Sequence, residues 1–72
     1  MSVAKVIELL AEGSTIEEAA ESAVSEASKT LSDVKHVYIS EIQGLVENGQ
    51  VSKYRVNCKV TFVVKGEDSA DS

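Results

Sequence analysis

The chain has 72 residues, a net charge of -5 and one cysteine. A domain this short buries only about 60% of the surface that its unfolded chain exposes, so it usually needs disulfides, a structural metal or association with other copies. Cys58 alone cannot form an internal disulfide, and the sequence has no Cys/His cluster for zinc. Oligomerisation therefore remains as the expected source of stability.

Charge and hydropathy argue against two further classes of protein. The net charge of -5 argues against nonspecific nucleic-acid binding, which depends on clustered Lys and Arg side chains, although Lys53, Arg55 and Lys59 fall on one strand. The apolar stretch 3–10 is interrupted by Lys5 and Glu8, and it is too short for a membrane span or a signal-peptide core. An unpaired thiol inside an apolar run fits a reducing compartment. We therefore expect a cytoplasmic protein that binds neither nucleic acid nor membranes.

The first half of the chain predicts a strand followed by a helix. Residues 3–10 are rich in β-branched and aliphatic side chains, and the loop that follows is expected at residues 11–14. Thr15 and Glu18 have the spacing of a capping box, in which each side chain binds the other residue's backbone N–H. From there, apolar residues recur every three or four positions, which predicts one helical stripe. The stripe consists of Ile16, Ala19, Ala20, Ala23, Val24, Ala27 and Leu31.

The second half predicts a β-hairpin with strands at residues 34–47 and 51–64. Asn48 and Gly49 between the strands are typical of a type I′ turn, which needs two residues with positive φ. Alternation divides the last strand into a core set and a polar set. The core set is Tyr54, Val56, Cys58, Val60, Phe62 and Val64, and the polar set is Lys53, Arg55, Asn57, Lys59 and Thr61.

The first hairpin strand alternates over a shorter length. Val37 and Ile39 are expected in the core, with His36, Tyr38 and Ser40 on the opposite face. Gly44 is a candidate for a bulge or bend, which leaves the register beyond Glu41 open.

These elements predict an α+β fold of β-α-β-β order, with a three-stranded antiparallel sheet packed on one helix. The domain is expected to span residues 1–65, and the acidic tail 66–72 is expected to be disordered. One helix cannot cover the full length of the strands. The uncovered face carries His36, Tyr38, Arg55 and Lys59, and we interpret it as a surface for self-association and ligand capture.

Three segments stand out when they are taken in order: "KVIEL" at residues 5–9, "EASKTL" at 26–31 and "NGQVSKYRVNCKVTFVV" at 48–64. Together with the order of the elements, these segments resemble the dodecins, small flavin-binding proteins of bacteria and archaea. The resemblance implies a dodecin-like fold and a homododecamer, a hollow shell with its helices outside. It also implies flavin bound at subunit contacts, for storage or protection. In flavin-binding members, a tryptophan on the first hairpin strand stacks on the isoalloxazine ring and a glutamine on the second binds the ring edge.

Both of these positions differ in this sequence. Alignment through "TLSDV" and "KYRV" puts His36 at the tryptophan position and Arg55 at the glutamine position. Imidazole is smaller than indole, whose stacking contributes about 0.5–1.5 kcal/mol beyond its buried area. Arg55 can stack on a ring or pair with a phosphate, and Tyr38 can supply an aromatic plane on the same face. The resemblance therefore gives His36, Tyr38 and Arg55 as cofactor-binding residues, for a flavin of the FMN or riboflavin type.

Other interpretations of these residues stay open. His36 and Tyr38 also fit plain interface packing, and Arg55 with Lys59 fits a charge network between subunits. An alternative function is a dodecin-fold shell that has lost flavin binding and holds divalent cations or another small anionic metabolite, since oxygen ligands from different chains can converge. No catalytic residue is expected. Cys58 shares its face with apolar side chains and has no activating base there, and no carboxylate pair or phosphate loop is present.

Overall fold

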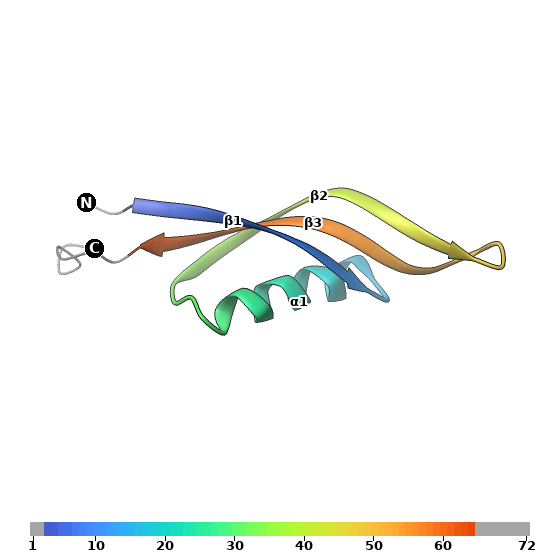
Figure 1. The fold of residues 1–72 in the computed structure, drawn as a ribbon, viewed down its shortest axis with the longest axis horizontal. Coiled ribbons are helices and arrows are strands. Elements are labelled where there is room, and N and C mark those ends of the chain that lie inside the picture. The colour runs from blue at the N-terminus through green and yellow to red at the C-terminus, as the bar shows by residue number, and fades with distance from the viewer. Residues whose placement is uncertain (1–2, 65–72) are drawn as a thin grey trace.

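The computed structural model describes residues 3–64 and confirms the predicted β-α-β-β order (Figure 1). Strand β1 spans Val3–Gly13, helix α1 spans Ile16–Ser28, strand β2 spans Val34–Glu47 and strand β3 spans Gln50–Val64. The strands form one antiparallel sheet in the order β1-β3-β2, and α1 lies across one face. The predicted tail 66–72 lies outside the described residues.

Strand β1 is longer than the sequence indicated. Residues 11–13 were expected in a loop, but Ala11 pairs with Val56 and Gly13 pairs with Tyr54. The long strand β3 offers backbone partners to these residues, and such tertiary pairing overrides a weak local preference for a turn. The connection to α1 is therefore reduced to Ser14 and Thr15.

The start of α1 confirms one half of the predicted capping box and corrects the other. Thr15 has an extended backbone, and its Oγ1 accepts the Glu18 backbone N–H at 3.0 Å. The Glu18 carboxylate does not return to Thr15; its Oε1 accepts from Ser14 Oγ at 2.8 Å. At the other end the helix stops at Ser28. Leu31 therefore lies beyond the helix, where its N–H donates to Ala27 O at 3.0 Å.

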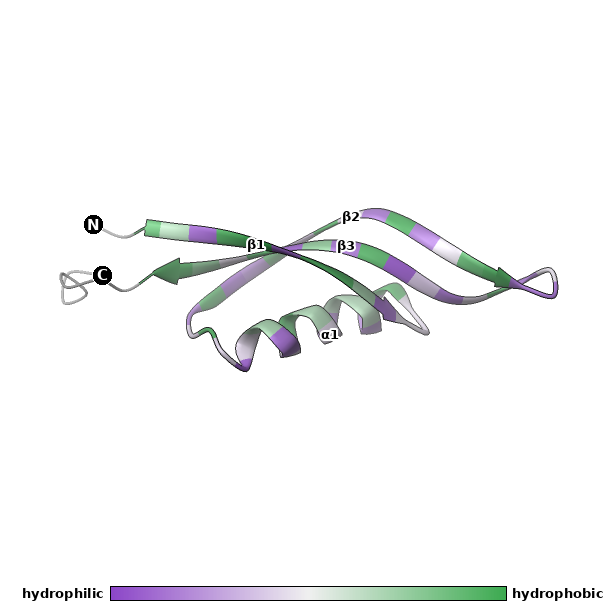
Figure 2. Cartoon of the chain, viewed as in Figure 1, coloured by the Kyte–Doolittle hydropathy of each residue, from purple (hydrophilic) through white to green (hydrophobic). Residues whose placement is uncertain are grey.

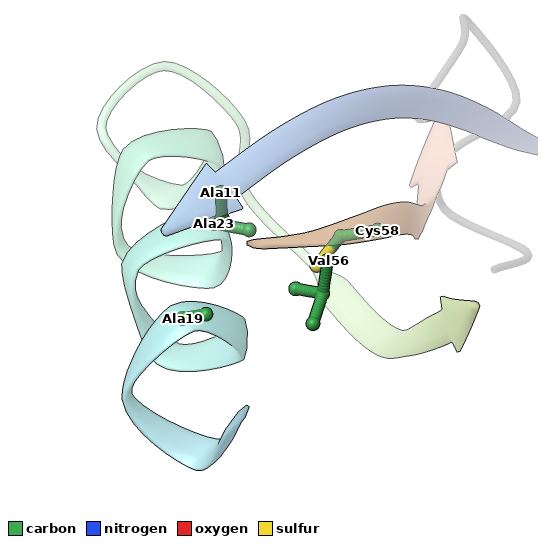
Figure 3. Close-up of a cluster of buried hydrophobic side chains, with 5 residues drawn as sticks. All are labelled: Ala11, Ala19, Ala23, Val56 and Cys58. Carbon is green, nitrogen blue, oxygen red and sulfur yellow. The ribbon is translucent and has the colours of Figure 1, made fainter. Parts of the chain in front are cut away.

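The core is made of small side chains between α1 and the sheet. Ala11, Ala19, Ala23, Val56 and Cys58 form its buried cluster. Figure 3 shows Ala19 and Ala23 on the side of α1 that faces Val56 and Cys58 of β3. Because alanine adds little bulk, the predicted alanine stripe brings the helix close to the sheet. Leu9, Ile16, Val37 and Ile39 pack around this cluster and are partly buried.

The hairpin has the predicted turn but an unexpected bulge. Asn48 and Gly49 have φ values of 53° and 75°, as a type I′ turn requires. The register shifts at three places along β2: between Val34 and His36, between Ser40 and Gln43, and between Leu45 and Val46. Glu41, at the middle shift, has a φ of 50°. Gly44, the predicted bulge position, pairs regularly with Tyr54, so the bulge lies instead at Glu41 and Ile42, whose residue types gave no such indication.

A single helix leaves much of this elongated molecule uncovered. The radius of gyration is 15.1 Å, whereas a compact domain of this length would have about 11 Å. Figure 2 shows hydrophobic residues at the N-terminal end of β1 and at the C-terminal end of β3, both beyond the end of α1. The large apolar side chains that are more than half exposed are Val3, Val6, Leu10, Tyr38, Ile42, Val46 and Val51. Within residues 3–64, no helix has the length and apolar character needed to cross a membrane.

Candidate functional site

The face of the sheet opposite α1, which we call the open face, carries all the predicted site residues. Its side chains alternate with the buried Val56, Cys58 and Val60 of β3. The open face comprises Val6, Glu8, Leu10 and Glu12 on β1, Lys53, Arg55, Asn57, Lys59 and Thr61 on β3, and His36, Tyr38, Ser40 and Gln43 on β2. The prediction that His36, Tyr38, Arg55 and Lys59 share one uncovered face is confirmed.

His36 and Tyr38 lie together on β2, which is an edge strand of the sheet. His36 is paired with Thr61, and Tyr38 is paired with Lys59. Both residues are exposed, and Tyr38 is 65% exposed. An exposed aromatic ring beside an imidazole offers flat surfaces on which a planar ligand can stack.

Arg55 is held by a carboxylate that the sequence analysis did not identify. In the sheet, Arg55 lies between Gln43 of β2 and Glu12 of β1. Its Nε and Nη2 donate to Glu12 Oε2 at 3.0 and 2.7 Å, and Lys53 Nζ lies 3.3 Å from Glu12 Oε1. Hydrogen bonds from Arg55, then from Lys53, hold the pKa of Glu12 below its usual value of 4.5. The guanidinium is therefore drawn toward β1, away from the strand that carries His36.

The position of Glu12 was missed because residues 11–13 were expected in a loop. Once they are paired in β1, the antiparallel register brings Glu12 opposite Arg55. A signal was available in the sequence. Glu8, Leu10 and Glu12 are two positions apart, so the two-residue period of the predicted strand 3–10 continues as far as Glu12.

Within one chain, His36 and Arg55 are far apart although both lie on the open face. His36 pairs with Thr61, which is six positions from Arg55 along β3 and therefore about 20 Å away. Tyr38 pairs with Lys59, four positions from Arg55. One planar ligand lying on His36 and Tyr38 would therefore not reach Arg55 of the same chain.

The middle of the open face has hydrogen-bonding capacity that the chain does not use. Asn57 Nδ2 donates to Glu8 Oε2 at 2.8 Å. Because an ionised carboxylate only accepts, this bond fixes the orientation of the amide. Asn57 Oδ1 is then buried without a partner among the described residues. Lys59 lies opposite Glu8 and Tyr38 and forms no ion pair within residues 3–64.

The family model for dodecin matches residues 3–65. The chain belongs to the dodecin family. A single-residue variant of the dodecin of Thermus thermophilus has 28% sequence identity and a TM-score of 0.84, over 92% of this chain and 100% of that one. The dodecin of Streptomyces coelicolor has 25% identity and a TM-score of 0.82, over 92% and 96% of the two chains. The dodecin of Streptomyces davaonensis has 21% identity and a TM-score of 0.81, over 90% of this chain and 97% of that one. No protein of curated function matches at significant similarity.

In this dodecin, Cys58 is a packing residue, as its position in the apolar set predicted. Its side chain is fully buried beside Val56 in the core cluster, and burial raises the pKa of the thiol. A raised pKa keeps the sulfur protonated at neutral pH, whereas a nucleophilic cysteine needs the thiolate. Among residues 3–64, no group of three or more His, Cys, Asp or Glu side chains is arranged to hold a metal ion.

Proposed function

We propose that this dodecin forms a cytoplasmic homododecameric shell that binds and stores or sequesters a flavin of the riboflavin or FMN type and catalyses no reaction. The observation that carries the proposal is the open face itself, which combines the exposed pair His36 and Tyr38 with the donors Lys59 and Arg55. Membership of the dodecin family supports flavin as the planar ligand.

The geometry of the single chain supports a site between copies. Val6, Leu10 and Tyr38 are exposed on the open face, which favours its burial against another subunit. A donor from that subunit would also pair with the buried Asn57 Oδ1, which has no partner among the described residues. His36 and Arg55 of one chain are about 20 Å apart along β3. A flavin that contacts Arg55 as well as His36 and Tyr38 would therefore contact His36 and Tyr38 of one copy and Arg55 of another.

In this arrangement Tyr38 serves as the stacking surface and His36 lies beside it. A phenol ring has a smaller π surface than the indole of the family's tryptophan, so we expect weaker flavin binding than in members that keep the tryptophan. Lys59, adjacent to Tyr38 across the strands, can donate to carbonyl or hydroxyl oxygens of the ligand.

The proposal is tested by titrating riboflavin and FMN with the purified protein and following flavin fluorescence, with native mass spectrometry of the same sample. We expect a dodecamer that quenches both flavins weakly. The double substitution His36→Trp with Arg55→Gln should strengthen binding by about tenfold or more, because it restores the indole plane and a neutral amide. Lys29→Trp, at the end of α1 and away from the open face, is the control for an added tryptophan and should leave binding unchanged.

Each alternative has its own signature in these measurements. A stable monomer at micromolar concentration would refute the assembly. A dodecamer in which neither the parent nor the double variant quenches flavin would refute the flavin site. If the shell does not bind flavin but carries excess mass from divalent cations or from another anionic metabolite, the alternative function is established.

A further inference from the structure

A cluster of charged side chains surrounds Arg55 at one end of the open face. The cluster consists of Lys53, Arg55 and Glu12, and all three of its polar contacts are short. Both carboxylate oxygens of Glu12 are used, Oε2 by Arg55 and Oε1 by Lys53. The cluster is partly exposed, with 42% of the Arg55 side chain and 38% of the Glu12 side chain accessible. A ligand can therefore reach it, but only in competition with Glu12.

Glu12 already occupies the edge of Arg55 that suits anions best. Guanidinium binds carboxylate and phosphate through neighbouring N–H groups, and these charge-assisted bonds are the strong ones. In this chain, Nε and Nη2 both point to the same Glu12 oxygen. A phosphate that approached this edge would have to displace a carboxylate that is tethered in the sheet opposite Arg55.

We propose that Glu12 is a specificity residue of the open-face site: by occupying Arg55, it excludes phosphate and carboxylate groups there and selects a ligand that is neutral where it meets Arg55. Of the five N–H groups of arginine, two are used by Glu12. The other three can donate to carbonyl or hydroxyl oxygens. The inference rests on the proposed flavin function and assigns the contact to a neutral part of the flavin; the phosphate of FMN, if bound, lies elsewhere.

The inference is tested with Glu12→Gln, and Glu8→Gln is the matched control. Both substitutions remove one negative charge from the open face of β1. Glu8, however, accepts from Asn57 and forms no ion pair within residues 3–64. The two carboxylates are about 13 Å apart along the strand, which exceeds the screening length of about 10 Å at 0.1 M salt. The comparison therefore separates release of Arg55 from a general change in charge.

The first readout does not depend on flavin. Arg55 is the only arginine of the chain, so its side-chain Nε–H gives a single NMR resonance that can be followed with inorganic phosphate. Modification by phenylglyoxal, which adds to accessible guanidinium groups, gives a single adduct by mass spectrometry. At 0.1 M salt, Glu12→Gln should raise phosphate affinity and the modification rate about tenfold, and Glu8→Gln less than about twofold.

The second readout is the ratio of FMN to riboflavin affinity, which should rise in Glu12→Gln and stay constant in Glu8→Gln. Absence of riboflavin binding in every variant would count against the proposed function, while the phosphate and phenylglyoxal results would still decide the role of Glu12. The inference is overturned if phosphate binds Arg55 equally well in the parent and in Glu12→Gln. It is also overturned if the two substitutions have equal effects.

Discussion

Gly13 is the last residue of β1, and its close approach to α1 leaves no room for a side chain. A Cβ at this position would lie 2.6 Å from Ala19 N and 3.0 Å from both the carbonyl carbon and the Cβ of Glu18. Two of these atoms belong to the helix backbone, and Ala19 N–H donates to Thr15 O at 3.1 Å. The clash can therefore be relieved only if the end of β1 or the first turn of the helix shifts. Gly13→Ala should destabilise the fold by about 1–3 kcal/mol, the range typical of overpacking.

Gly44→Ala is the matched control, since it adds the same methyl group to the same sheet. Its Cβ would meet only the methyl groups of Val51, at 3.3 and 3.5 Å, and Val51 is 51% exposed and free to turn away. We expect a loss below about 0.5 kcal/mol, as for most surface substitutions. The assay is urea unfolding followed by circular dichroism at one fixed protein concentration, because association changes apparent stability. A Gly13→Ala protein as stable as the parent, or a larger loss in Gly44→Ala, would refute the steric argument.

Two further predictions concern titratable side chains. Cys58→Ser should lower stability by about 1–3 kcal/mol, because the buried cluster around it is apolar; rapid thiol labelling of the native parent would contradict this burial. The pKa of Glu12 is lowered in the folded protein by its pairing with Arg55 and Lys53. This pairing therefore stabilises the fold fully above pH 4.5, the ordinary glutamate value, and its contribution is lost as the pH falls through the lowered pKa. The difference in urea midpoint between parent and Glu12→Gln should therefore be largest near neutral pH and shrink as the pH falls through the lowered pKa of Glu12; a constant difference would argue against the pairing.

Local signals in the sequence were sufficient for the order and type of the secondary-structure elements and for the division of the strands into two faces, although not for the ends of β1 and α1. The Asn48-Gly49 turn, the alanine stripe and the alternation from Tyr54 to Val64 each depend on neighbouring residues, so a single sequence contains all the information they need. The same alternation sufficed to assign His36, Tyr38 and Arg55 to one surface. Three short segments indicated a resemblance to dodecins, and the family model confirmed it.

Register was decided only by the tertiary structure. Pairing of residues 11–13 with β3 turned an expected loop into strand and brought Glu12 to Arg55, a contact between residues 43 positions apart. The bulge at Glu41 and Ile42 likewise shifts the pairs from Gln43 to Leu45, and a further shift between Leu45 and Val46 restores the register next to the turn. Periodicity tells which face a residue occupies but not which residue lies opposite, because that depends on how whole strands align to bury Val56, Cys58 and Val60 together. For this reason the sequence alone determined the open face, while only the fold showed that Arg55 is held by Glu12 and lies far from His36.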